Sequence, residues 1–299
     1  MNEIRNNGQL TVAAVQMSSQ QDIEANLADI RSAISEASKQ GAQLVVLPEN
    51  CCSMGRQFAT AERFDELSDA MAEYARAFGI YLLAGSLPCP YRPDGVIVPN
   101  GRLRQVSQLF APDGTRVARY DKIHLFTATV ADKQGSYNEA ANFEPGTQTV
   151  VVPLEANDAV YQLGMMVCFD LRFPALAQRL RQAGAEVLSA PSAFTYLTGQ
   201  AHWSLLLRAR ALDSQCMVIG AAQGGEHIYK NDDSRQTWGH TTITAFDGSV
   251  IASHDSSELN LSTTSDIDKG YAIVMASLDK QAQVQGRQKL PIFDCHRLA

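Results

Sequence analysis

Two stretches of sequence decide the fold: residues 42–48, which read AQLVVLP, and residues 163–169, which read LGMMVCF. Both are apolar at consecutive positions, whereas a half-exposed strand alternates apolar and polar residues. Strands without that alternation are buried on both faces. We therefore expect an α/β protein in which two sheets pack face to face, each with helices on its outer side. A single doubly wound sheet is the alternative.

Strands and amphipathic helices alternate around the first stretch. The expected elements are a strand over 11–17, a helix over 22–40, a strand over 43–48, a helix over 61–78 and a strand over 80–86. A hairpin follows, which turns at Asp113-Gly114 and whose second arm ends in residues 120–126. Asp-Gly between apolar arms is a strong signal for such a turn.

The same order of elements returns in the second half of the chain. The expected elements are a strand over 161–169, a helix over 174–183, a strand over 186–190, a helix over 201–214 and a strand over 217–222. A second hairpin turns at Asp247-Gly248, and a strand over 271–278 closes this half. The paired hairpins favour two sheets. No linker separates the halves, so we expect a single domain over residues 1–299.

Composition and charge exclude several classes of function. With 45% hydrophobic and 19% charged residues, the 299-residue chain has the composition of a globular protein. Its net charge of −7 argues against non-specific nucleic-acid binding, which requires a basic surface. No run approaches the roughly 18 apolar residues of a membrane span, and the N-terminal MNEIRNNGQL does not resemble a signal peptide. We expect a cytoplasmic protein that binds neither nucleic acid nor membrane.

The six cysteines contain no C-x-x-C pair, which excludes zinc ribbons and thioredoxin-like redox sites. The histidines lack the H-E-x-x-H spacing, and neither a P-loop nor a G-x-G-x-x-G occurs. We therefore expect no metal and no cofactor. Cysteines of a cytoplasmic protein are mostly small, buried hydrophobic residues, and we expect this of five of the six. Cys168 is the exception, because its sequence context indicates a chemical role.

Cys168 lies in MMVCFDLRFP, where a strand gives way to a helix. Such a turn exposes a nucleophile on a rigid element, beside backbone N–H groups that can bind an oxyanion. A buried structural cysteine is the alternative. The polar residues Asp170 and Arg172, directly after an apolar strand, favour the nucleophile.

Glu49 ends the strand LVVLPEN and Lys122 lies in ARYDKIHLF. The carboxyl ends of strands gather ligand-binding groups in α/β sheets, although a solvated acid or a surface lysine explains each residue equally well by itself. A Cys–His pair with His124, His202 or His240 remains a minor alternative, since such pairs are formed in space and not in sequence.

The segments LPEN, YDKIHLF and VCFDLRFP, in that order, resemble the nitrilase superfamily. The resemblance continues through APSAF, GQAHWSLLLRARALDSQ, WGH and LPIFDCHR, and so covers nearly the whole chain. It implies a four-layer α-β-β-α sandwich with two facing mixed sheets, and usually a homodimer.

Carried onto this sequence, the resemblance implies a catalytic triad of Glu49, Lys122 and Cys168. Many members have a second glutamate after the lysine motif. Glu139 in SYNEAANFEPG matches it best, and Glu144 is the alternative.

Four further residues are expected to contact the substrate. The backbone N–H of Phe169 would bind the oxyanion, and Arg172, Phe194 and Thr195 would contact other parts of the substrate. The planar guanidinium of Arg172 suits a substrate carboxylate, while an ion pair with Asp170 or another acid explains it equally well.

CFDLRFP, PSAFTYLTGQAHW and RARALDSQC look most like the deaminated-glutathione amidases, with the ω-amidases that act on α-ketoglutaramate close behind. Thr127 departs from close relatives, which usually have Asp after HLF, and this change would reshape the rim of the pocket. The implied substrate is a small acidic primary amide, in the first place deaminated glutathione, and the implied product is ammonia. Carbamoylase and aliphatic amidase activities are alternatives, as is a non-catalytic binding or scaffold protein with the same fold.

In the expected mechanism, Cys168 attacks the amide carbonyl while Glu49 takes the thiol proton. A neighbouring ammonium lowers the pKa of a thiol, so Lys122 is expected to favour the thiolate. Lys122 and the N–H of Phe169 stabilise the oxyanion, and a thioester on Cys168 follows. Water activated by Glu49, with Glu139 nearby, then releases the acid.

Overall fold

The computed structural model describes residues 8–132, 135–229, 233–257 and 270–297. Residues 1–7, which carry most of the N-terminal stretch examined for a signal peptide, lie outside that part of the chain. None of the helices in the described ranges is long and apolar enough to cross a membrane.

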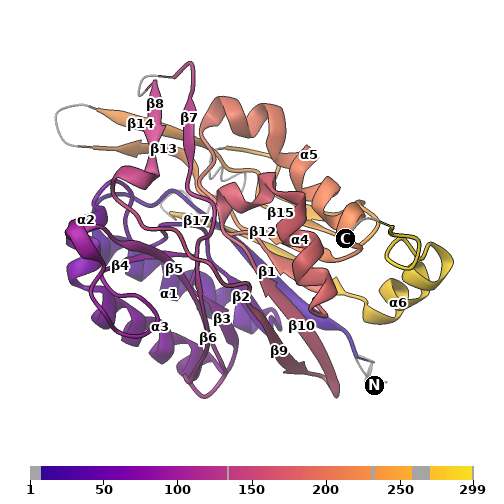
Figure 1. The fold of residues 1–299 in the computed structure, drawn as a ribbon. Helices are drawn as coiled ribbons and strands as arrows, with labels where there is room; N and C mark the ends of the chain where they lie inside the picture. The colour runs from indigo at the N-terminus through magenta and orange to yellow at the C-terminus, as the bar shows by residue number, and fades with distance from the viewer. Residues whose placement is uncertain (1–7, 133–134, 230–232, 258–269, 298–299) are drawn as a thin grey trace.

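Two large mixed sheets form the centre of the molecule (Figure 1). Within the described residues the first sheet has seven strands, in the order β17 (Tyr271–Leu278), β1 (Leu10–Met17), β2 (Leu44–Val46), β3 (Tyr81–Leu83), β5 (Arg104–Phe110) and β4 (Leu87–Cys89), with β6 (Arg116–Asp121) also paired to β5. The second has six, in the order β16 (Val250–Ser253), β15 (Thr242–Thr244), β12 (Met217–Gly220), β11 (Val187–Ser189), β10 (Ala159–Met165) and β9 (Val151–Ala156).

The apolar strands bury both faces, as expected. In β2, Leu44 and Val46 belong to the core between the two sheets, whereas Val45 belongs to a second core beneath the outer helices. Successive side chains of a strand point to opposite faces of the sheet, so both faces of β2 are buried. The buried face of β10, with Leu163 and Met165, lies in the same core as Leu44.

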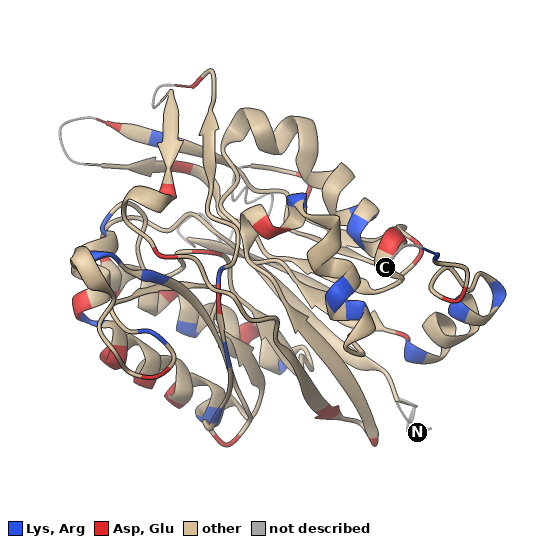
Figure 2. Cartoon of the chain, in the orientation of Figure 1, with Lys and Arg blue, Asp and Glu red and all other residues tan. Residues whose placement is uncertain are grey.

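Helices cover the outer face of each sheet. Helices α1 (Ile23–Lys39) and α3 (Phe64–Phe78) pack on the first sheet, and α4 (Pro174–Gln182) and α5 (Tyr196–Ser214) pack on the second (Figure 1). The architecture is therefore the expected α-β-β-α sandwich, and the doubly wound sheet is excluded. The colours of Figure 2 mark acidic residues along α1 and α3, and basic residues on α4 and on α6 (Lys280–Lys289).

Local signals set several boundaries. The Asp22 side chain accepts hydrogen bonds from the N–H groups of Glu24 and Ala25, which caps α1 at its expected start. Gly79 ends α3 in the left-handed conformation, with φ of 62°. Both Asp-Gly hairpins form, with Phe110 opposite Arg116 in the first and Thr244 opposite Val250 in the second.

Other boundaries differ from the sequence prediction. The helix expected over 61–78 is two helices, α2 (Gln57–Glu62) and α3, because Arg63 between them leaves the helical conformation. The helix expected from residue 201 begins earlier, at Tyr196. In its first turn Gly199 lies so close to Trp238 that an added Cβ would be 2.1 Å from the Trp238 Cβ.

Two predicted strands end early. The strand expected over 161–169 stops at Met165, and a 3-10 helix over Cys168–Arg172 follows it. The hairpin arm expected to end in 120–126 stops at Asp121. Both endings place catalytic candidates just beyond a strand, where a side chain can point into a cavity.

The C-terminal strand β17 does not complete the second sheet. It pairs antiparallel with β1 over its full length, from Tyr271 opposite Met17 to Leu278 opposite Leu10. The two halves repeat the expected order of elements, but β17, which comes from the second half of the chain, belongs to the first sheet. Two small hairpins were not predicted: β7 (Thr127–Thr129) with β8 (Ser136–Asn138), and β13 (Gly224–Ile228) with β14 (Ser234–Trp238).

Candidate active site

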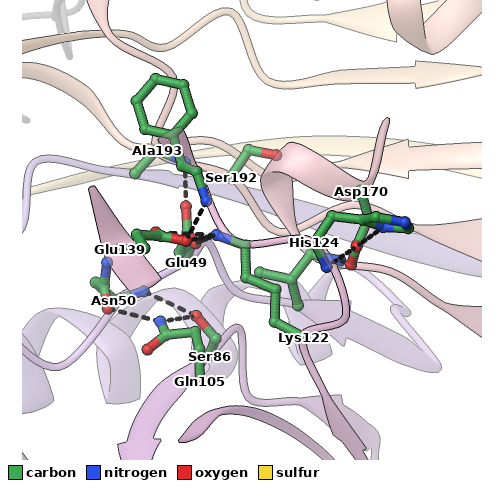
Figure 3. A network of polar contacts seen from close by, with 12 residues as sticks. Glu49, Asn50, Ser86, Gln105, Lys122, His124, Glu139, Asp170, Ser192 and Ala193 are labelled. Carbon is green, nitrogen blue, oxygen red and sulfur yellow. Dashed lines mark hydrogen bonds and ion pairs between the residues drawn. The ribbon is translucent and has the colours of Figure 1, made fainter. Parts of the chain in front are cut away.

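The two sheets bring Glu49, Lys122 and Cys168 together (Figure 3 labels the first two). Glu49 follows β2, Lys122 follows β6, and Cys168 follows β10. The three side chains therefore come from both sheets. All are buried: Glu49 is 3% exposed, Lys122 1% and Cys168 9%.

Both carboxylate oxygens of Glu49 are fixed. Oε1 lies 2.9 Å from the Lys122 Nζ, and Oε2 accepts the backbone N–H of Ala193 at 3.0 Å. The Glu49 backbone is held as well, because its carbonyl accepts a hydrogen bond of 3.0 Å from the Gln223 side chain. Gly85 supports this segment from the next strand: an added Cβ there would lie 1.9 Å from the Pro48 carbonyl oxygen.

Lys122 is held between two carboxylates. Besides Glu49, its Nζ lies 3.0 Å and 2.9 Å from the two oxygens of Glu139. Burial alone would lower the pKa of Lys122, but the attraction of Glu139 and Glu49 outweighs it and raises the pKa well above its ordinary value. Lys122 is therefore a permanently charged ammonium in this site.

The structure distinguishes Glu139 from Glu144. Glu144 forms ion pairs with Arg92, Arg102 and Arg104, and none with Lys122 is found among the described residues. The hydrogen bond from Arg92 is the largest cause that lowers the pKa of Glu144 to about 2. Of the two candidates for the second glutamate, Glu139 is the one that contacts Lys122. It is also the residue that the sequence favoured.

Cys168 begins the 3-10 helix with φ of 50°, a left-handed conformation that is unusual for a residue other than glycine. Its N–H donates to the Pro191 carbonyl at 2.8 Å. Strained backbone of this kind is frequent where a side chain must be presented to a ligand.

The electrostatics of Cys168 differ from the sequence prediction. Burial, followed by the negative charge of Glu49, raises the pKa of the Cys168 thiol well above its ordinary value, and Lys122 only partly opposes this. Two carboxylates already surround one ammonium, so a thiolate would add a second excess negative charge. The raised pKa keeps the Cys168 thiol neutral, and Glu49 is its hydrogen-bond partner.

The Phe169 N–H lies in the first turn of the 3-10 helix, where N–H groups have no partner within the helix. Its neighbours are engaged, since the N–H of Cys168 donates to Pro191 and that of Asp170 to the Val167 carbonyl. Phe169 also lines the pocket at Cys168, which makes its N–H a candidate oxyanion donor.

A pocket opens at the Cys168 thiol and encloses about 220 Å³, including the part open to solvent. Its lining includes all the residues expected to contact substrate: Phe169, Arg172, Phe194 and Thr195. Thr127, the departure noted in the sequence, lies on the exposed face of β7.

The guanidinium of Arg172 lies over two aromatic rings of this pocket, 5.8 Å from the centre of Phe169 and 5.2 Å from that of Phe194. Its Nη1 contacts the His202 Nδ1 at 3.3 Å, and burial lowers its pKa. No carboxylate pairs with it in the described ranges, which excludes the alternative of an ion pair with Asp170.

Asp170 instead connects the two halves of the site, a role that the sequence did not reveal. Its side chain is fully buried and accepts a hydrogen bond from the His124 N–H at 3.0 Å (Figure 3). It also accepts one from the Tyr120 hydroxyl at 2.7 Å. Both donors flank Lys122 in the chain. Asp170 therefore ties the segment of the lysine to the helix of the nucleophile. Its position two residues after Cys168 was the only signal for this in the sequence.

The histidines are engaged elsewhere. The Nδ1 atom of His124 lies 2.7 Å from Asp170, and that of His240 lies 2.7 Å from the Trp238 carbonyl oxygen. That of His202 contacts Arg172. In the part of the chain that the structure describes, the polar partner of the Cys168 thiol is Glu49 and not a histidine.

Comparison with known proteins agrees with this geometry. The sequence model of the carbon-nitrogen hydrolase family matches residues 11–275. The chain is 39% identical to a deaminated glutathione amidase of Yersinia enterocolitica over 245 residues, which are 80% of this chain and 81% of the relative. It is 34% identical to the human omega-amidase NIT2 over 267 residues, 88% of this chain and 86% of the relative.

Among solved structures, Nit3 of Saccharomyces cerevisiae, a member of branch 10 of the nitrilase superfamily, matches with a TM-score of 0.72 and 26% identity. The match covers 97% of each chain. The chain therefore belongs to the carbon–nitrogen hydrolase family of the nitrilase superfamily, and is a hydrolase of carbon–nitrogen bonds.

Proposed function

We propose that this protein is an amidase that hydrolyses deaminated glutathione through a thioester on Cys168. The observation that carries the chemistry is the buried cluster in which Lys122 lies between Glu49 and Glu139, with Glu49 hydrogen-bonded to the Cys168 thiol. The choice of substrate is supported by the names of relatives that are 35–39% identical over most of the chain.

One part of the sequence-based expectation is chemically inconsistent. Glutathione is a tripeptide whose two amide bonds are both secondary, so cleavage of its deaminated form releases an amine and not ammonia. We therefore assign the γ-amide as the scissile bond, and a 2-oxo dicarboxylic acid and cysteinylglycine as the products. Ammonia would be the product from α-ketoglutaramate, which has the same acyl group on a primary amide.

In the first step the Cys168 sulfur attacks the amide carbonyl and Glu49 accepts the thiol proton. The raised pKa of Cys168 requires this transfer to accompany attack, because little thiolate exists beforehand. The ammonium of Lys122 and the N–H of Phe169 stabilise the oxyanion. Loss of one such donor typically lowers the rate about 10²–10³-fold.

Glu49 then returns the proton to the amide nitrogen, the carbon–nitrogen bond breaks, and the amine leaves the thioester on Cys168. Water attacks the thioester while Glu49 accepts a proton from it. The carbon–sulfur bond breaks, the acid leaves, and the sulfur regains its proton from Glu49. Glu139 keeps Lys122 charged and in place through both steps.

The test uses purified protein and mass spectrometry. With deaminated glutathione we expect equal amounts of 2-oxoglutarate and cysteinylglycine, and, in acid-quenched samples, an acyl group on the peptide that contains Cys168. Cys168→Ala should fold normally and form neither product. Cys295→Ala, which removes an exposed cysteine, is the matched control and should behave like wild type. Product formation by Cys168→Ala would contradict the mechanism.

A second candidate is ω-amidase activity, favoured by the 34% identity to human NIT2. The two substrates differ only on the amine side of the scissile bond. The ratio of kcat/KM for deaminated glutathione to that for α-ketoglutaramate therefore decides between them. A ratio well above one supports the proposed substrate, and a ratio well below one favours the ω-amidase.

A further inference from the structure

A second cavity lies beside the pocket at Cys168 and encloses about 860 Å³, again including the part open to solvent. Its walls are the hairpin β7–β8, the hairpin β13–β14 and the first residues of α5. Both hairpins project from the same end of the molecule, next to the start of α5 (Figure 1). None of the residues assigned to catalysis lines this cavity.

The two cavities share a wall. Phe126 lines the nucleophile's pocket and contacts Tyr137 of the second cavity, with ring centres 5.2 Å apart. Ala193 provides a second link. Its N–H donates to the Glu49 carboxylate at 3.0 Å, and its carbonyl accepts 2.7 Å from the Arg235 Nη2.

Arg235 is the cation of the second cavity, and it has no carboxylate partner among the described residues. Its guanidinium lies 5.3 Å from the ring centre of Tyr137 and hydrogen-bonds to the phenol of Tyr229. Its Nε is buried without a hydrogen-bond partner. Nε itself is closed to solvent, but the side chain as a whole is half-buried and lines the cavity, so a ligand oxygen can bind the rest of the guanidinium.

The two acids of the cavity are engaged with other groups. Asp132 accepts hydrogen bonds from the Tyr137 hydroxyl at 2.7 Å and the Gly135 N–H at 2.9 Å. Glu226 accepts one of 2.6 Å from the Ser234 hydroxyl. Neither neutralises Arg235, although both reduce the positive potential there. A ligand must therefore place its negative charge at the guanidinium itself.

We propose that this cavity binds the amine side of the amide substrate and that Arg235 binds a carboxylate there. The inference rests on the proposed function and extends it from the acyl group to the leaving group. The length of the leaving group suits this distance. The contacts of Ala193 hold the Glu49 carboxylate and the Arg235 guanidinium within about 10 Å of each other, and an extended dipeptide spans about 7 Å. The terminal carboxylate of cysteinylglycine can therefore reach Arg235 from the scissile bond.

The experiment compares deaminated glutathione with the same compound methylated on its glycine carboxylate. In wild type we expect kcat/KM to be about 10- to 100-fold higher for the acid than for the ester, mainly through KM, because two charge-assisted hydrogen bonds are lost. In Arg235→Gln this ratio should fall towards one. In Arg235→Lys, which keeps the charge but not the two-donor fork, it should lie between the two.

The ratio corrects for structural damage, since a disturbed Ala193 would slow both substrates alike. Arg116→Gln, which removes an exposed arginine on β6, is the matched control and should keep the wild-type ratio. The inference is overturned if wild type has an acid-to-ester ratio of kcat/KM near one, or if Arg235→Gln keeps the wild-type ratio. Either result leaves the proposed substrate unaffected. Wild type that cleaves α-ketoglutaramate but not the acid contradicts the proposed substrate and the subsite together.

Discussion

The charges around Cys168 determine how this side chain can act as the proposed nucleophile. A thiol with a raised pKa beside a carboxylate is not pre-ionised, unlike the thiolates found next to unpaired cations. Glu49 therefore has two opposing effects. It disfavours the resting thiolate through its charge, and it makes attack possible as the proton acceptor.

Glu49→Gln separates these two effects. Removal of the carboxylate charge should lower the pKa of Cys168, so the midpoint pH for alkylation by iodoacetamide should fall. Turnover should nevertheless drop by about 10²–10⁴-fold, because the base is gone. Peptide mapping of Cys168 across a pH series measures the first effect and steady-state kinetics the second. An unchanged or higher midpoint would show that Glu49 does not control the thiol.

Arg172 is predicted to bind a carboxylate of the acyl group from within the nucleophile's pocket. Arg172→Lys keeps the charge but loses the planar fork, so KM for an acidic amide should rise about 10-fold. Arg179→Lys on the exposed face of α4 is the control. Equal KM values in wild type and Arg172→Lys would remove this residue from the binding site.

The sequence could place Glu49, Lys122 and Cys168 in one candidate site because their three motifs, taken together and in order, resemble the nitrilase superfamily. It could not choose between Glu139 and Glu144, which lie in one short segment. That choice depends on Arg92 and Arg104, which reach Glu144 from other parts of the chain. The state of the thiol likewise depends on how many charges folding gathers around it.

At the scale of elements, the site depends on how closely neighbouring strands approach. Gly85, with φ of 54°, lies against the Pro48 carbonyl immediately before Glu49. A side chain at this position would push the end of β2, and the carboxylate with it, out of place.

Gly85→Ala should therefore lower both stability and activity. A left-handed alanine costs about 1–2 kcal/mol by itself, and the collision with backbone adds about 1–3 kcal/mol. Gly101→Ala is the control. Gly101 has a similar left-handed φ of 66°, but an added Cβ there would have nothing within 4 Å, so the variant has the backbone strain without the collision. Urea unfolding and kcat of both variants test this. Equal losses would mean that close approach at Gly85 does not matter.

The long elements and the two Asp-Gly hairpins could be predicted because local sequence signals them. The hairpins β7–β8 and β13–β14 could not, because their strands are short, only partly buried and bounded by ordinary loop residues. They are also the walls of the second cavity. The part of the molecule that we propose to bind the leaving group was therefore the least visible in the sequence.

At the scale of the whole molecule, buried polar groups join parts that are distant in sequence. His227 of β13 is fully buried, with Nδ1 2.7 Å from the Ser19 carbonyl oxygen and Nε2 2.7 Å from the Thr237 hydroxyl. It connects a wall of the second cavity to the loop after β1. Burial lowers its pKa to about 4.

This pKa predicts a loss of stability in acid. In the unfolded chain His227 becomes protonated below about pH 6.5, whereas in the folded protein it stays neutral down to about pH 4. Between these values, acid therefore stabilises the unfolded chain. The free energy of unfolding should fall by about 2 kcal/mol between pH 7.5 and 5 from this residue. Urea unfolding should show a smaller decrease in His227→Gln than in His296→Gln, an exposed control. Identical slopes would contradict the assignment.

Sequence patterns predicted the two sheets and their outer helices, but not which sheet the last strand joins. An apolar run such as 271–278 fits either sheet, and the choice depends on the free edge of β1. One domain over residues 1–299 and a homodimer stay predictions.

The pairing of β1 with β17 also has a consequence during synthesis. Translation at about 5–20 residues per second delivers β17 roughly 10–50 s after β1. Until then β1 has an unpaired edge that can bind other chains, and the core between the sheets lacks Val274 and Leu278. A ribosome that stalls before residue 271 therefore holds a nascent chain that has every residue of the candidate site but an unpaired β1 edge, which chaperones can bind.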